Sequence, residues 1–231
     1  MKNFVNVSPL KILEKASQSV LGRGNLGVLI ARPGVGKTAC LINIGFDNLL
    51  QEKKLVHVSL EDSPEKVTSY YNVIMRDFPE SLQLTGETQM KPLLEKNRMI
   101  MAYLNQSFEI RRLRDNLKNL TEKIAFTPDA IIVDGLDFSR FGKDIFHEFK
   151  EMASEFQVEM WFSALSHSNA PEAEEEGFSY LEPDIEDLFS VMIQLSATQN
   201  EITLRLLKDH QGEVTSDLQL KLDARTFLAL P

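Results

Sequence analysis

The chain has 231 residues, a formal net charge of −9, and 43% hydrophobic and 26% charged residues. This composition is ordinary for a globular protein with a sizeable core, and no apolar run approaches the length of a membrane span. Cys40 is the single cysteine, which excludes an intrachain disulfide. We therefore expect one cytoplasmic domain over residues 1–231, without a membrane-bound segment.

The acidic balance also bears on nucleic acids as partners. A protein that holds nucleic acid through its phosphates usually has a basic balance or a basic patch. The net charge therefore makes such a partner less expected, although it leaves a local basic patch open.

The first half of the chain predicts three strands with helices between them. Ser8-Pro9 is a good helix start, and apolar residues follow it at helical spacing. Strands are predicted over Leu26–Ile30, Leu55–Leu60 and Arg98–Leu104, and helices over 38–44 and 64–76. Residues 77–97 are predicted to be less regular, because Pro79, Gly86 and Pro92 punctuate them.

The second half begins with an amphipathic helix whose apolar face runs from Ile110 to Ile124. Its other sides carry Arg111, Arg112, Arg114 and Lys118, which form either a phosphate-binding surface or, as we favour, a solvated helix face. Further strands are predicted over Ala130–Asp134 and Val158–Leu165, with a helix near 145–156 between them. After a long polar segment at 169–187, a hairpin of Ser190–Ala197 with Glu201–Lys208 and a strand at Leu218–Leu222 close the chain.

The most specific chemical pattern is Ala31-Arg32-Pro33-Gly34-Val35-Gly36-Lys37-Thr38, between a predicted strand and a predicted helix. This is the pattern and the context of a phosphate-binding loop, in which glycines let successive N–H groups point at an anion. Lys37 would reach the β- and γ-phosphates, and the Thr38 hydroxyl would ligate Mg²⁺. We expect ATP to contact Arg32, Pro33, Gly34, Val35, Gly36, Lys37, Thr38 and Ala39.

Carboxylates follow two of the predicted strands. Glu61 and Asp62 come after the second strand, and Asp134 ends a strand that is apolar throughout. Strand ends of an open α/β sheet form its ligand-binding side. We expect Asp134 to orient Mg²⁺, directly or through water, and Glu61 to lie on the same ligand-binding side.

From about residue 8 to 223 the chain resembles the RecA-like ATPase core, in the branch of DnaB-type replicative helicases and KaiC-type clock ATPases. The motifs that carry the resemblance are Ala31–Ala39 with Leu41–Ile44, Ser59-Leu60-Glu61, Ile131–Asp134, Leu165-Ser166-His167 and Leu207–His210. The resemblance implies a three-layer P-loop NTPase fold, with a mostly parallel, twisted sheet and antiparallel C-terminal strands. It also makes Glu61 the catalytic glutamate.

Two further roles follow from the resemblance alone. His167 stands at the position of a polar sensor that is usually glutamine in the helicases. Lys208 matches the lysine of a Lys-x-Arg pair that reaches into the neighbouring subunit's ATP, while His210 fills the arginine position. The expected assembly is accordingly a homo-oligomer, such as a hexameric ring.

Three functions remain open. The first is a KaiC-like ATPase or ATP-dependent switch that acts through protein partners. The second is a DNA-acting motor or accessory factor of the helicase type, and the third is a scaffold that binds nucleotide without hydrolysis. We favour the first, because eight acidic residues and no basic ones lie between Glu172 and Asp187, in a segment that commonly faces DNA in RecA-like proteins.

Overall fold

The structure is a computed structural model that describes residues 4–78, 87–166, 181–214 and 218–230. Within these residues nine strands form one sheet, in the order β3-β2-β4-β5-β1-β6-β7-β8, with β9 also paired to β7. The strands are β1 (Leu26–Ala31), β2 (Leu55–Ser59), β3 (Arg98–Ala102), β4 (Ala130–Asp134), β5 (Glu159–Leu165), β6 (Phe189–Ala197), β7 (Ile202–Asp209), β8 (Gly212–Glu213) and β9 (Gln219–Leu222). Pairs from β3 across to β6 are parallel, and β7 pairs antiparallel with β6, β8 and β9.

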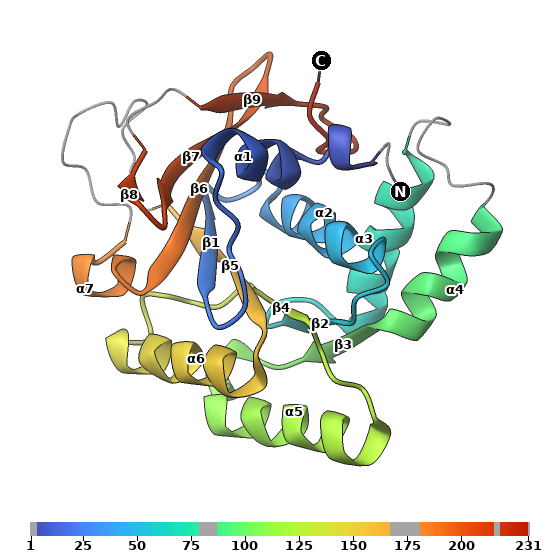
Figure 1. Cartoon of the computed structure of the whole chain (residues 1–231), viewed down its shortest axis with the longest axis vertical. Helices are drawn as coiled ribbons and strands as arrows, with labels where there is room; N and C mark the ends of the chain where they lie inside the picture. The colour runs from blue at the N-terminus through green and yellow to red at the C-terminus, as the bar shows by residue number, and fades with distance from the viewer. Residues whose placement is uncertain (1–3, 79–86, 167–180, 215–217, 231) are drawn as a thin grey trace.

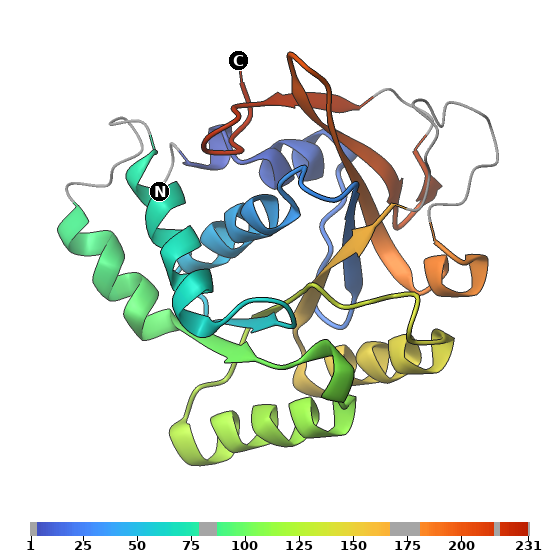
Figure 2. The same cartoon turned by 180° about the vertical axis from the view of Figure 1, so that it is seen from behind.

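Helices cover both faces of the parallel part of the sheet (Figures 1 and 2). The helical segments are η1 (Phe4–Asn6), α1 (Pro9–Ser17), α2 (Lys37–Leu49), α3 (Pro64–Arg76), α4 (Glu87–Asn97), η2 (Asn105–Ser107), α5 (Ile110–Ile124), α6 (Lys143–Phe156) and α7 (Pro183–Glu186). The helices α1, α2 and α3 pack on one face, and α5 and α6 pack on the other. The fold is therefore a three-layer α/β arrangement with antiparallel C-terminal strands, as the sequence predicted.

Strand β1 illustrates why the layers form. All six of its residues are buried, as expected for a parallel strand covered on both faces. Leu29 and Ala31 pack into the core beneath α1 and α2, whereas Val28 and Ile30 pack into the core beneath α5 and α6. This alternation shows that β1 is covered on both faces. The strand order places β1 between β5 and β6, so the segment after it begins inside the sheet edge and not at its end.

The predicted strands agree with the observed ones to within two residues at each end, but one prediction about helices was wrong. The segment at 77–97 contains helix α4, in which Pro92 lies inside the helix. A proline there removes one backbone hydrogen bond, and this disfavours a helix. Burial of Leu94 against the core beside α2 and α3 offsets that loss, a tertiary contribution that local punctuation does not reveal.

The polar segment at 169–187 lies only partly within the described residues. Its residues before 181 lie outside the described part of the chain, and α7 follows as a short helix. Ile185 is buried there and joins the core on the α6 side, which explains why this turn is helical. Among the described residues, no helix has the length and apolar character needed to span a membrane.

Candidate functional site

A cavity of about 1060 Å³ opens at the carboxyl ends of the parallel strands. Its lining includes most of the predicted loop, namely Pro33, Gly34, Gly36, Lys37, Thr38 and Ala39. Glu61 and Asp134, which follow or end neighbouring strands, line the same cavity. The fold thus brings together the loop and the two carboxylates at the edge where open α/β sheets bind ligands.

The loop joins β1 to α2 with left-handed backbone at Gly34 (φ 78°) and Gly36 (φ 109°), conformations that suit glycine. Lys37 is the first residue of α2, so its N–H belongs to the unpaired, partially positive end of that helix. Its Nζ lies 3.5 Å from the carbonyl oxygen of Arg32. Burial lowers the pKa of Lys37, while Asp134 and Glu61 oppose that shift, which is the setting of a lysine poised for an anionic ligand. Arg32 and Val35 belong to the loop but do not line the cavity.

Asp134 is held by two hydroxyl groups at the foot of the cavity. Thr38 Oγ1 donates to Asp134 Oδ2 at 2.6 Å, and Ser163 Oγ donates to Asp134 Oδ1 at 2.6 Å. Because the Thr38 hydroxyl gives its proton to Asp134, its oxygen lone pairs remain available to a cation. A hydroxyl and a carboxylate side by side fit Mg²⁺, which takes oxygen ligands and usually completes its shell with water and substrate phosphates.

Glu61 leaves β2 beside the backbone of Gly135. A side-chain carbon at position 135 would lie 2.7 Å from Cγ of Glu61, and Gly135 has a φ of 79°. Burial raises the pKa of Glu61, and the charge of Asp134 adds to the increase. Its neighbour Asp62 instead pairs with Lys66 at 2.6 Å, one helical turn away, and does not line the cavity.

Sequence reasoning missed two polar residues that support the site. Ser163 accepts a hydrogen bond from Gly135 N at 2.9 Å while it donates to Asp134. The available signal was a lone serine among the apolar residues that follow Glu159 in this strand. Asn105 donates to the Gly135 carbonyl at 2.6 Å and lines the cavity. It follows β3 by three residues, and no local pattern distinguishes it from an ordinary loop asparagine.

The remaining predicted site residues lie elsewhere. His167 is outside the described residues. Lys208 on β7 does not line the cavity, and its Nζ donates to the Glu186 carbonyl at 3.0 Å. His210 Nε2 lies 2.9 Å and 3.0 Å from the carbonyl oxygens of Val20 and Leu21. Both side chains thus contact their own chain, and their reach toward a neighbouring subunit stays a prediction.

The basic helix α5 divides into two parts. Arg114 pairs with Glu155 at 3.5 Å and Lys118 pairs with the same carboxylate at 3.1 Å, so both side chains are tied to α6. Arg111 and Arg112 are exposed on the first turn. Arg114 and Lys118 are therefore engaged by a carboxylate of the same chain, and Arg111 and Arg112 leave a small basic surface on the first turn.

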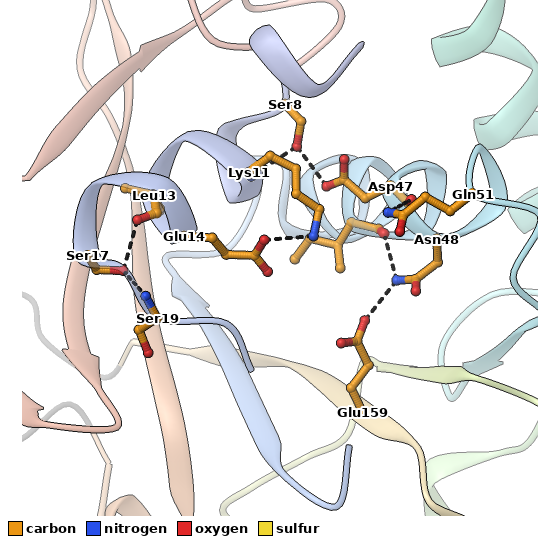
Figure 3. A network of polar contacts seen from close by, with 11 residues as sticks. Ser8, Lys11, Leu13, Glu14, Ser17, Ser19, Asp47, Asn48, Gln51 and Glu159 are labelled. Atoms are coloured by element: carbon orange, nitrogen blue, oxygen red, sulfur yellow. Dashed lines mark hydrogen bonds and ion pairs between the residues drawn. The ribbon is translucent and has the colours of Figure 1, made fainter. Parts of the chain in front are cut away.

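A buried polar network lies behind α2, on the side that faces α1 (Figure 3). Ser8, the N-cap of α1, donates to Asp47 Oδ2 at 2.7 Å, and both residues are buried. Lys11 Nζ contacts Glu14 at 2.7 Å, and Asn48 donates to Glu159 of β5 at 2.8 Å. These contacts fasten the phosphate-loop helix to the first helix and to the sheet.

This network holds more carboxylates than cations. Glu14, Asp47 and Glu159 act on one another electrostatically. Lys11 is the cation that acts on both Glu14 and Asp47, and Lys53 acts on Glu14. Burial raises the pKa of Asp47 to about 7, although the hydrogen bond from Ser8 and the charge of Lys11 oppose it. Asp47 is consequently partly protonated near neutral pH.

Comparison with known proteins adds one relative to this geometry. The chain is 28% identical over 161 residues to a probable plasmid replicative DNA helicase from Chlamydia psittaci. The match covers 60% of this chain and 34% of the relative, so the chain spans about a third of that protein's length. No protein-family model matches the chain.

Proposed function

We propose that this chain binds ATP with Mg²⁺ in the cavity and hydrolyses it to ADP and phosphate. The observation that carries the proposal is the 2.6 Å contact between Thr38 and Asp134, within a cavity that Lys37 and Glu61 also line. A hydroxyl, a carboxylate, a lysine at a helix N-terminus and a second carboxylate are the set that phosphoryl transfer to water requires.

Each residue has a distinct role in this reaction. The oxygen of a water molecule attacks the γ-phosphorus, the bond to the β,γ-bridging oxygen breaks, and ADP leaves with the electron pair. Glu61 takes a proton from the attacking water, and Lys37 offsets negative charge on the transferring phosphoryl group. Thr38 and Asp134 would hold Mg²⁺, which supplies further charge neutralisation at the phosphates when bound.

The proposal predicts that Lys37→Ala weakens ATP binding roughly 100-fold or more, since charge-assisted hydrogen bonds each contribute ~1.5–3 kcal/mol. Calorimetric titration with a non-hydrolysable ATP analogue and Mg²⁺ measures the effect. Lys123→Ala is the control, because Lys123 is exposed on α5 and lies outside the cavity. Equal affinity of wild type and a folded Lys37→Ala variant would rule out the phosphate-loop interpretation.

What the hydrolysis of ATP serves is a separate question. The helicase relative favours action on nucleic acid over a KaiC-like switch. The acidic residues between Glu172 and Asp187 and the net charge of −9 favour a protein partner rather than nucleic acid. We expect the dissociation constant of this chain for labelled DNA to exceed ~1 μM at ~150 mM salt. The reason is that Arg114 and Lys118 already pair with Glu155. Fluorescence anisotropy with ATP·Mg²⁺ present tests this.

Tighter, salt-sensitive binding would decide for the helicase-type function. Arg111→Glu combined with Arg112→Glu serves as the matched variant, since these two arginines form the exposed basic surface on the first turn of α5. If the double variant abolished that binding, the first turn of α5 would be the contact. If binding stayed tight in the variant, the DNA contact would lie elsewhere on the chain.

We further propose that the active form is a homo-oligomer with ATP near a subunit interface, as the Lys208 segment of the resemblance implies. Lys208 would have to exchange its contact with the Glu186 carbonyl for one in the neighbouring subunit. We expect Lys208→Ala to reduce turnover more than nucleotide affinity. Phosphate release measures turnover, and titration of a non-hydrolysable ATP analogue measures affinity. Solution scattering with and without ATP·Mg²⁺ measures the oligomeric state, and a fully active monomer would contradict the proposal.

A further inference from the structure

The segment after β9 forms a tight turn at residues 223–227. Asp223 Oδ1 accepts hydrogen bonds from Arg225 N at 3.0 Å, from Thr226 N at 2.8 Å and from Thr226 Oγ1 at 2.8 Å. Phe227 then adopts a left-handed backbone, with a φ of 54°. A bulky residue in that region is strained, so contacts around the turn must hold it in place.

Those contacts are made with the phosphate-loop helix. Asn43, buried on α2, donates to the Thr226 carbonyl at 2.7 Å. The Phe227 ring lies directly over Gly36, where a side-chain carbon would be 2.2 Å from Cζ of Phe227. The turn therefore packs against the loop itself, and glycine at position 36 is needed for this approach as well as for its backbone angle.

One side chain of the turn faces the ligand cavity. Arg225 is exposed and lines the same cavity as Lys37, Glu61 and Asp134. The groups whose charges act on Lys37 and Glu61 are Asp134, Asp62, Lys66 and each other, and Arg225 is not one of them. The charge of Arg225 acts instead on Asp223 of the same turn, so its guanidinium belongs to the side of the cavity that the turn forms.

We propose that Arg225 binds the nucleoside end of the nucleotide, and that Asn43 and Phe227 position the turn that carries it. The inference rests on the proposed ATP site. A guanidinium is planar, stacks on aromatic rings and donates several hydrogen bonds, so it suits a purine base and the ribose oxygens. Arg225 would touch the ligand, whereas Asn43 and Phe227 act through the backbone of the turn.

The test compares ATP, ADP and inorganic tripolyphosphate, each with Mg²⁺, as competitors of a fluorescent ATP analogue. We expect Arg225→Ala to weaken ATP and ADP by the same factor, roughly tenfold, and to leave tripolyphosphate unchanged. A parallel loss for tripolyphosphate would overturn the proposal in favour of a phosphate contact. Unchanged affinity for all three ligands would overturn it as well.

Controls separate this inference from the site on which it rests. If wild type fails to bind ATP, the proposed function fails; if wild type binds and Arg225→Ala matches it, the inference alone fails. Arg111→Ala is the matched arginine control, because Arg111 is exposed and lies outside the cavity.

The positioning role of Asn43 has its own readout. Asn43→Leu removes the donor to Thr226 while keeping a similar volume. We expect it to lower the affinity for ATP relative to tripolyphosphate, and to show no additive effect when combined with Arg225→Ala. A purely structural role would lower the unfolding midpoint without changing the ratio of the two affinities, and that result would contradict positioning.

Discussion

Glu61→Gln is expected to lower ATP turnover ~100-fold or more while ATP affinity stays close to that of wild type. The substitution keeps the shape of the side chain and removes the carboxylate that would accept the proton of the attacking water. Glu61 lines the cavity and lies beside the backbone of Gly135, at the edge where the loop and Asp134 meet. Phosphate release under saturating ATP·Mg²⁺ gives turnover, and titration of a non-hydrolysable analogue gives affinity.

Asp62→Asn is the matched control, because this neighbour pairs with Lys66 and lies outside the cavity. It should change turnover little. If Asp62→Asn abolished turnover and Glu61→Gln did not, the two carboxylates would have exchanged roles. If the wild type itself released no phosphate in any oligomeric form, the scaffold alternative would replace the ATPase.

The pH dependence of turnover provides a second check on Glu61. Burial and the charge of Asp134 raise the pKa of Glu61, so the carboxylate takes up a proton at a higher pH than an exposed glutamate would. Turnover should therefore fall, as the pH is lowered, through a pKa above the ordinary 4.5.

The parts of the site that the sequence predicted are those set by local chain order. A glycine loop between a strand and a helix, and an aspartate at the end of an apolar strand, specify Lys37, Thr38 and Asp134 without knowledge of the fold. Parallel strands then bring their carboxyl ends to one edge, which is why the loop and Asp134 meet across 96 residues of chain.

The parts that the sequence did not predict depend on contacts between distant segments. Asn43 meets Thr226 across 183 residues, and nothing near either residue indicates the contact. Helix α4 forms despite Pro92 because its packing outweighs the local signal. The resemblance implies that Lys208 contacts ATP of a neighbouring subunit. Within its own chain, Lys208 donates a hydrogen bond to the Glu186 carbonyl, which the sequence did not indicate.

The burial of Asp47 was likewise not predictable from the sequence near it. Asn43, Asp47 and Asn48 would usually mark the solvent face of a helix, yet all three are buried on α2. Asn43 donates to the Thr226 carbonyl near the C-terminal end. Asp47 accepts from Ser8 near the N-terminal end, and Asn48 donates to Glu159 (Figure 3). The backbone near both ends is also joined, since Ala229 N donates to the Val7 carbonyl at 2.8 Å. The phosphate-loop helix is thus the common anchor of the two ends of the fold.

This burial makes the stability of the protein depend on pH in a defined direction. The pKa of Asp47 is raised to about 7 in the folded chain, chiefly by burial, from an ordinary value of 3.8. A carboxyl whose pKa is higher when folded favours folding below its unfolded pKa, and that contribution is lost as the pH rises through the folded pKa. Between pH 5 and pH 8 we expect the free energy of unfolding to fall by about 2–3 kcal/mol from this group alone.

Asp47→Asn should remove most of that dependence. The amide stays neutral at every pH, and its oxygen can still accept the hydrogen bond from Ser8. Urea denaturation at pH 5 and pH 8 should therefore show a smaller difference for the variant than for wild type, and the variant should be the more stable of the two at pH 8. Asp115→Asn, an exposed aspartate within helix α5, should leave the difference as in wild type. Equal pH dependence in wild type and Asp47→Asn would mean that Glu14, whose pKa burial also raises and which acts on Asp47 electrostatically, takes up the proton instead.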